Sequence, residues 1–342
     1  MNSPLVTICI PVYLSELYIE KCLSSVFNQT YLNINLIIHY DPCDDNTLKL
    51  TTELLSESPY KYKVIEHNDI PGVGAARGRM LDAFNGDYLY FLDSDDYIEP
   101  CCIEHLVKNA IEYSADFVVG SYREVDSKYQ RLKDVILPNK IIFSSEEFQN
   151  FFYVEKGFYP PYPWNKLISS AFLENNEIDF PKVTYGEDAF FSFLELQLIR
   201  KIVFVPKITL NYLIRENSLT TSEATVSKIE DIILFRNFVY NYLKDNNSEH
   251  IVSYKLECYK TCFILIARDC FLSSKILKGD KRRLLKKGLK ITHKIPKIYL
   301  KNSRFSFSKI LFLVTQKSPM MLNLFIINLY GYYKKINNFF KL

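Results

Sequence analysis

The feature of this sequence that most constrains its fold is a regular alternation of short apolar runs with helical segments over residues 5–92. The apolar runs are rich in β-branched and aromatic residues and are predicted to be strands: residues 5–10, 34–39, 62–67 and 87–92. Between them the apolar spacing predicts helices over residues 16–28, 47–56 and 72–84. Strands that alternate with helices form a mostly parallel sheet with helices on both faces. We therefore expect an α/β fold with a ligand site beyond the carboxyl ends of its strands.

Beyond residue 130 the regular alternation ends. A proline-rich loop with the only tryptophan covers residues 159–167, a loop leading into a helix covers 182–197, and a pair of strands interrupted by Pro206 covers 201–214. From about residue 222 the apolar spacing is helical to the end. We predict two parts, an α/β domain over residues 1–222 and a helical, basic region over residues 223–342.

The formal net charge of +3 conceals an uneven distribution. Residues 281–342 hold 15 of the 42 Lys and Arg side chains and none of the 39 Asp and Glu side chains. A basic tail favours a phosphate-bearing partner, either nucleic acid or an anionic membrane surface. Because no nucleic-acid-binding motif accompanies the charge, we expect no nucleic acid and favour attachment of residues 278–342 to a membrane surface. The alternative is a helical subdomain that packs its apolar face on the rest of the protein.

The N-terminal stretch, the length of the apolar runs and the cysteines indicate the cellular compartment of the protein. The N-terminal stretch has no basic region before its short apolar run, so we do not expect a signal peptide. No apolar run reaches the length needed to span a membrane. The 8 cysteines form no CxxC pair, and Cys9, Cys22 and Cys262 lie inside apolar runs. We interpret them as reduced, mostly buried thiols of a cytosolic protein.

The fourth predicted strand runs directly into an acidic turn, Asp93-Ser94-Asp95-Asp96. Three carboxylates so close together repel one another unless something positive lies between them. A divalent cation such as manganese or magnesium, which prefers oxygen ligands, would remove that repulsion and would also bind the phosphates of a substrate. The alternative is a solvated turn that caps the next helix.

The acidic turn occurs together with other stretches that carry a family resemblance. These stretches are "VTICIPVY" (6–13), "CLSSVFNQTY" (22–31), "YDPCDDNT" (40–47), "GVGAARGRMLDAFNGDYLYFLDSDD" (72–96), "WNKL" (164–167) and "YGEDAFF" (185–191). With them the chain resembles the family 2 inverting glycosyltransferases of the GT-A fold, over roughly residues 5–220. The resemblance implies a GT-A nucleotide-diphospho-sugar transferase fold and an enzyme of the bacterial surface-polysaccharide type.

In the resembled family, the ends of the first two strands hold the nucleotide base. This implies base contacts here for Pro11, Val12, Tyr13 and Asp41. Asp41 would accept a hydrogen bond from the N3–H of uracil. Tyr13 would lie against the base or, alternatively, only pack within its loop. The chain departs from the family pattern at Pro42, which replaces a glycine.

The resemblance also implies residues for the diphosphate and for a cofactor. Arg77 matches an arginine at the start of a helix behind two glycines, so it would contact the diphosphate or, alternatively, pair with the acidic turn. Asp95 would ligate Mn²⁺ or Mg²⁺ directly, and Asp93 would reach the ribose, or the metal through water. Ser94 is assigned to the nucleotide-sugar site with them.

The same resemblance supplies a candidate general base. Asp188 would take the proton of the acceptor hydroxyl, with Glu187 as the second candidate or an orienting group. The alternative for both acids is that they only complement a helix dipole. Trp164 would pack against a sugar face or line the acceptor pocket or, alternatively, only be a buried anchor of its loop, and Lys166 would brace the site. Arg215 is assigned a contact with the diphosphate when the segment after it closes.

Taken together, the resemblance implies transfer of a sugar, most simply from a UDP-sugar, to a hydroxyl of a glycan or lipid-linked glycan acceptor. The enzyme would be cytoplasmic and peripheral on the inner face of the cell membrane. One alternative is transfer to a polyprenyl phosphate, whose ionised oxygen needs no base. Another is a degenerate domain that binds or scaffolds without catalysis.

Overall fold

The computed structural model describes residues 3–66, 72–155, 159–176, 178–181, 183, 185–215, 225–246, 275–277, 279–281, 283, 284 and 287. The chain divides into two compact units, Met1–Glu216 and Asn217–Leu342, and each is described by itself. The division predicted after residue 222 falls inside the second unit, in a stretch outside the described residues.

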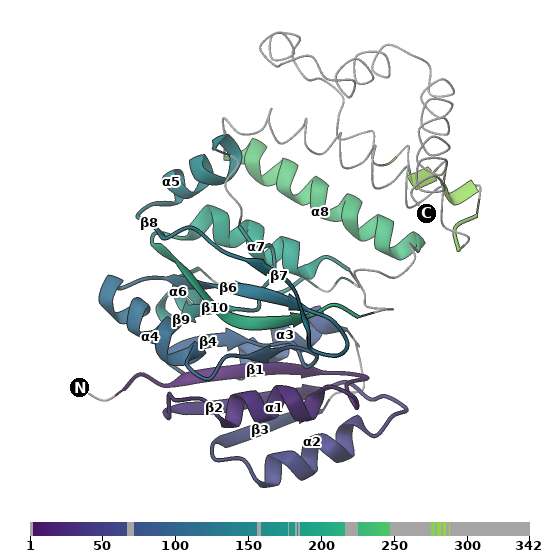
Figure 1. Ribbon diagram of the computed structural model, residues 1–342. Coiled ribbons are helices and arrows are strands. Elements are labelled where there is room, and N and C mark those ends of the chain that lie inside the picture. The colour runs from purple at the N-terminus through teal and green to yellow at the C-terminus, as the bar shows by residue number, and fades with distance from the viewer. Residues whose placement is uncertain are drawn as a thin grey trace. The chain divides into compact units, whose positions relative to one another are not determined.

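The first unit is built on one mixed sheet. Its strands are β1 (Val6–Val12), β2 (Ile34–Tyr40), β3 (Lys61–Glu66), β4 (Tyr88–Phe91), β5 (Tyr97–Ile98), β6 (Phe117–Val125), β7 (Arg131–Val135), β8 (Lys140–Ile142), β9 (Lys166–Ser169) and β10 (Ile202–Leu213). They pair in the order β3-β2-β1-β4-β9-β6-β10-β5, with β7 added to β6 and β8 to β10 (Figure 1). The pairs among β3, β2, β1 and β4 are parallel, as predicted, whereas β9 is antiparallel to both of its neighbours.

Helices lie on both faces of this sheet. They are α1 (Ile19–Phe27), α2 (Thr47–Ser56), α3 (Val73–Asp82), α4 (Cys102–Tyr113), α5 (Ser145–Gln149), α6 (Ser170–Asn176) and α7 (Glu187–Leu198), with a π-helical turn η1 (Asn150–Val154) after α5. One apolar cluster joins α1, α2 and α4 to one face, and another joins α3, α5, α6 and α7 to the other face.

The alternation of side chains along a strand explains these two clusters. In β1, Ile8 and Ile10 belong to the cluster under α1, whereas Cys9 between them belongs to the cluster under α3. A strand that is apolar at every position therefore lies in the middle of the sheet with both faces buried. This arrangement places the carboxyl ends of β1, β2 and β4 at one edge.

The predicted elements of the first unit are largely confirmed, with two differences. The strand predicted to stop at Pro11 continues through it to Val12. Residues 201–214 form one long strand rather than a pair. The pairing of β10 with β6 shifts register between Val205 and Ile208, on either side of Pro206, because proline has no N–H to donate to the ladder.

In the second unit the structure describes the helix α8 (Val226–Asp245), which lies within the stretch predicted to be helical, and most of the rest of that stretch lies outside the described residues. Among the described residues, no helix is both long and apolar enough to cross a membrane. The predicted membrane segment, residues 278–342, lies outside the described residues except for six positions. Two of these, Arg283 and Lys287, pair with Glu230 of α8 at 2.6 and 3.0 Å.

Candidate active site

The acidic turn lies where β4 leaves the sheet, beside the loop that follows β1. The hydroxyls of Ser15 and Ser94 lie 2.6 Å apart and join the two loops. Ser94 is buried and its side chain is engaged in this contact. The structure therefore assigns Ser94 a part in holding the turn, and its predicted contact with a nucleotide sugar stays a prediction.

Three carboxylates of this turn could share one cation. One carboxylate oxygen from each of Asp93, Asp95 and Asp96 lies within 4.8 Å of the other two. Asp96 is 1% exposed, and its Oδ1 accepts a hydrogen bond from the backbone N–H of Leu213 at 2.9 Å. Its Oδ2 is buried without a hydrogen-bond partner among the described residues. An all-oxygen set with an unsatisfied buried carboxylate oxygen fits Mn²⁺ or Mg²⁺.

Burial and mutual repulsion disfavour the ionised form of these acids. Burial raises the pKa of Asp95, Asp93 raises it further, and Arg215 opposes both. Burial, with Asp95 and Asp93, raises the pKa of Asp96 well above its ordinary value. A cation bound here would return the acids to their ionised form.

Two arginines supply positive charge to the turn. Arg215, at the end of the described part of the first unit, contacts Asp95 through Nε at 2.6 Å. Arg77 of α3, which is 3% exposed, contacts Asp93 at 2.7 Å and Glu187 at 2.6 Å. The alternative noted for Arg77, an ion pair with the acidic turn, is what the structure shows. Its predicted contact with a diphosphate stays a prediction, as does that of Arg215.

The candidate bases begin helix α7, directly after Gly186, whose φ of +83° lies in the left-handed region that glycine tolerates. Glu187 is buried and held by Arg77. Asp188 is partly buried, and its Oδ1 accepts a hydrogen bond from the N–H of Ala189 at 2.7 Å. Burial raises the pKa of Asp188, and Arg77 opposes this increase. Among the described residues no ion pair involves Asp188, whereas Glu187 is paired with Arg77, and this suits the predicted base.

The residues predicted to bind the nucleotide base are only partly exposed to solvent. Tyr13 is 54% exposed, as expected for a residue that meets a ligand. Asp41 is buried, and its Oδ2 accepts a hydrogen bond from the N–H of Gly72 at 3.0 Å. Its Oδ1 is also buried, 3.6 Å from Nδ1 of His39. Pro11 lies within β1. The base contacts of these residues stay predictions, and the contact of Asp41 requires that one of its oxygens be uncovered.

Trp164 does not offer a ring face to a ligand. It is 4% exposed and stands between two tyrosines, stacked on Tyr162 at 4.5 Å and on Tyr212 at 5.3 Å between ring centroids. The edge of Tyr122 meets it at 5.1 Å. Since both faces of the indole are covered, the arrangement matches the alternative of a buried anchor, and the predicted acceptor contact of Trp164 stays a prediction.

Lys166 lies deeper than predicted, in a cluster that the sequence analysis missed. Lys166 and Glu195 are both 0% exposed and form an ion pair of 2.6 Å. The hydroxyl of Tyr159 also donates to Glu195. The signal available in the sequence was a single glutamate among the apolar residues of "FFSFLELQL" and a single lysine in "WNKLIS". Charged residues in apolar segments are buried only when they are paired.

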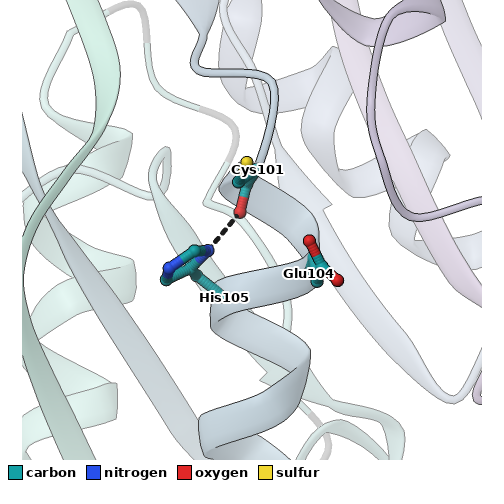
Figure 2. A group of neighbouring side chains, drawn as sticks. All are labelled: Cys101, Glu104 and His105. Carbon is teal, nitrogen blue, oxygen red and sulfur yellow. Dashed lines mark hydrogen bonds between the residues drawn. The ribbon is translucent and has the colours of Figure 1, made fainter.

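A second group of possible metal ligands, Cys101, Glu104 and His105, lies at the start of α4 (Figure 2). Nδ1 of His105 donates to the backbone carbonyl of Cys101 at 2.9 Å, as Figure 2 shows, and Nε2 lies 2.6 Å from Nζ of Lys207. Glu104 accepts a hydrogen bond from the hydroxyl of Thr30. Because both ring nitrogens are engaged, this group is a poorer metal site than the acidic turn.

Comparisons with known proteins agree with this geometry. The model of the family described as "Glycosyl transferase family 2" matches residues 7–172. Glycosyltransferase GlyA of Streptococcus pneumoniae serotype 4 is 30% identical over 228 residues, which are 63% of this chain and 31% of GlyA. EpsH of Bacillus subtilis is 28% identical over 292 residues, which are 82% of this chain and 80% of EpsH. The chain thus spans less than a third of GlyA and most of EpsH.

Among solved structures, residues 1–349 of S. aureus TarS in complex with UDP-GlcNAc superpose with a TM-score of 0.56 at 17% identity. The match covers 90% of this chain and 78% of that one. At this identity the likeness shows a shared fold.

Proposed function

This chain belongs to the family 2 glycosyltransferases and has their GT-A fold, and on that premise we propose that it transfers a sugar from a nucleotide-diphosphate donor to a hydroxyl of a glycan or lipid-linked glycan, with inversion. The observation that carries the proposal is the bridge made by Arg77. It contacts Asp93 of the acidic turn and Glu187 beside the candidate base, so one side chain links the two acidic groups. A transferase needs such closeness because, in the transition state, the leaving diphosphate oxygen and the attacking hydroxyl oxygen are both partly bonded to the same carbon.

In the proposed reaction, Asp188 accepts the proton of the acceptor hydroxyl. The acceptor oxygen forms a bond to the anomeric carbon while the bond from that carbon to the diphosphate oxygen breaks on the opposite face. Glu187, held by Arg77, orients the acceptor or Asp188 rather than taking the proton, because its charge is committed to the ion pair. The structure of TarS with UDP-GlcNAc supports a UDP-sugar as the first donor to test.

The acidic turn would hold the cofactor. Asp95 and Asp93 would bind Mn²⁺ or Mg²⁺, and Asp96 is placed to join them. When bound, the cation would supply positive charge to the departing diphosphate. Since Arg215 now occupies Asp95, binding of the cation would release this arginine toward the diphosphate.

The test of this function is calorimetric binding of UDP, GDP, CDP and dTDP with and without Mn²⁺. We expect one diphosphate to bind in the presence of metal, and Asp95→Asn to lose that binding. The matched control is Asp82→Asn, which removes an exposed carboxylate at the end of α3. If no diphosphate binds under any condition, the chain is a degenerate binding or scaffold domain. Full turnover by Asp188→Asn would instead favour a polyprenyl phosphate acceptor.

We also propose that residues 278–342 hold the enzyme at the inner face of the cell membrane. The support is the charge of this segment together with its short apolar stretches. Co-sedimentation with vesicles of phosphatidylglycerol, compared with phosphatidylcholine, tests it. Binding only to the anionic vesicles, and its loss at high salt, is the expected result, whereas equal or no binding to both would mean that the segment packs on the protein.

A further inference from the structure

The helix that begins with the candidate base carries two more polar residues on the same face. Ser192 and Glu195 follow Asp188 by one and two helical turns, so the three side chains lie in a row along α7. Lys166 of β9 reaches this row from the sheet. Its Nζ lies 2.6 Å from Oε2 of Glu195 and 3.4 Å from Oγ of Ser192. The buried ammonium of Lys166 thus contacts the same face of α7 on which Asp188 lies.

The other contacts of Lys166 leave it little freedom. Its Nζ lies 4.2 Å from the centre of the Tyr159 ring, and the hydroxyl of Tyr159 donates to the same oxygen of Glu195. Oε1 of Glu195 is buried without a partner among the described residues. A fully buried ion pair is generally no more stabilising than well-packed apolar side chains of similar volume. Stability alone therefore gives little reason for charged residues at these two positions.

The charges that surround Asp188 come from several elements. In the part of the chain that the structure describes, the cations are Arg77 of α3 and Lys166 of β9. The ionisable neighbours of other kinds there are Asp93 after β4, Glu187 on α7 and Tyr162 before β9. Helix α5 also packs against α7, through the buried Phe148, whereas its Glu146 is exposed and its Glu147 bonds to the N–H of Phe143.

These two cations differ in what they can do for the base. Arg77 is divided between Asp93 and Glu187, both of which compete with Asp188 for its charge. Within the described residues, the acidic partner of Lys166 is Glu195, and that partner lies on the side of Ser192 away from Asp188. Burial lowers the pKa of Lys166, while Glu195 and then Asp188 raise it, so the ammonium is stabilised from both ends of the row.

We propose that Lys166 is a positioning residue for the general base: clamped by Glu195, Ser192 and Tyr159, its ammonium keeps the carboxylate of Asp188 ionised between turnovers, and Glu195 moderates that charge so that the carboxylate still accepts a proton. This inference rests on the proposed function, in which Asp188 takes the acceptor proton. A carboxylate that is stabilised too strongly is a weak base, and one that is not stabilised is already protonated. Lys166 therefore favours the ionised form of Asp188, whereas Glu195 favours its protonated form.

The experiment follows the titration of Asp188 itself, without any substrate. The protein is labelled with ¹³C at the aspartate carboxyl carbons, and the NMR signal of Asp188 is identified by its loss in Asp188→Asn. In Lys166→Met we expect the midpoint of this titration to rise by about one pH unit, and in Glu195→Gln to fall by a similar amount. The control, Lys201→Met, removes a lysine that bonds to the carbonyl of Tyr113 instead and should leave the midpoint unchanged.

A purely structural role of the cluster predicts a different result. In that case the variants would melt at a lower temperature while the titration midpoint of Asp188 stays unchanged. Alternatively, the midpoint would shift in the same direction in Lys166→Met and in Glu195→Gln. Either outcome overturns the proposal. If Lys166→Met does not fold, the double variant Lys166→Met/Glu195→Gln removes both charges, and its midpoint should lie above that of Glu195→Gln.

A kinetic measurement separates this proposal from the function on which it rests. Release of UDP from UDP-GlcNAc, with water as the acceptor, is followed against pH in the presence of Mn²⁺. Loss of release in Asp188→Asn, together with opposite shifts of the acidic limb in Lys166→Met and Glu195→Gln, supports both ideas. If Asp188→Asn releases UDP like the wild type, the proposed base is wrong. If Asp188→Asn does not release UDP, but the acidic limb of the pH dependence is unchanged in Lys166→Met and Glu195→Gln, only the proposed role of Lys166 is wrong.

Discussion

The acidic turn after β4 and the acidic start of α7 contain the same kinds of side chain, but the structure neutralises them differently. In the turn, Asp93 and Asp95 each pair with an arginine, and Asp96 is buried with one oxygen unsatisfied within the described residues. At the start of α7, Glu187 is paired with Arg77, and Asp188 has no ion-pair partner in the part of the chain that the structure describes. The first arrangement suits a group that exchanges one cation for another, and the second suits a group that exchanges a proton.

The largest effect expected from this difference is on turnover. Asp188→Asn keeps the shape of the side chain but removes the proton acceptor, so we expect turnover to fall by about 10²- to 10⁴-fold. Affinity for the donor nucleotide should remain, since Asp188 is not among the acids of the turn. Steady-state rates and calorimetry on the same preparation measure both quantities. A parallel loss of nucleotide binding would mean that the two acidic groups do not have separate tasks.

Asp95→Asn should show the converse pattern. Removal of one of the three neighbouring carboxylates is expected to weaken Mn²⁺ by roughly 100-fold, since the loss even of outer partners weakens metal sites by 10- to 100-fold. Titration of the protein with Mn²⁺, followed by electron paramagnetic resonance of the free ion, measures this affinity. Unchanged affinity would leave the turn as a set of ion pairs with the arginines and no metal site.

Arg215→Ala should change the affinity for Mn²⁺ in the opposite direction to Asp95→Asn. Arg215 competes with a cation for Asp95, so its removal should tighten Mn²⁺ binding in the absence of nucleotide by about three- to tenfold. The matched control is Arg131→Ala, which removes an exposed arginine that pairs with Asp134 instead. Weaker binding of Mn²⁺ in Arg215→Ala would show that the arginine supports the cation site.

The smallest expected effect is on the pH dependence of stability. Burial is the main cause that raises the pKa of Asp95 and of Asp96. Acids of this kind favour the folded state at low pH, and this stabilisation is lost as the pH rises through their folded pKa values. Mn²⁺ binds the ionised acids, so it should raise the melting temperature by a few degrees more at about pH 8 than at about pH 5. Calorimetric melting curves test this, and an equal shift at both pH values would place the bound ion elsewhere.

The parts of this protein that depend on local pattern can be predicted from its sequence. Apolar runs such as residues 5–10 can only be buried on both faces, and this predicts central parallel strands with helices between them. The acids after β4 then had to lie at the carboxyl edge, because a residue that follows such a strand has no other place. The resemblance to a family added Asp188, and the structure places it at the start of a helix as expected.

Which charged side chains form pairs depends on the tertiary structure. Arg77 and Glu187 are 110 residues apart in sequence, and Arg215 and Asp95 are 120 apart. No periodicity of the chain encodes such pairs, because they depend on how β9, β10 and α7 are laid against the first four strands. The same packing covered both faces of Trp164 and buried Lys166 against Glu195. A charged or aromatic side chain that is buried needs partners, and whether it is buried depends on the whole fold.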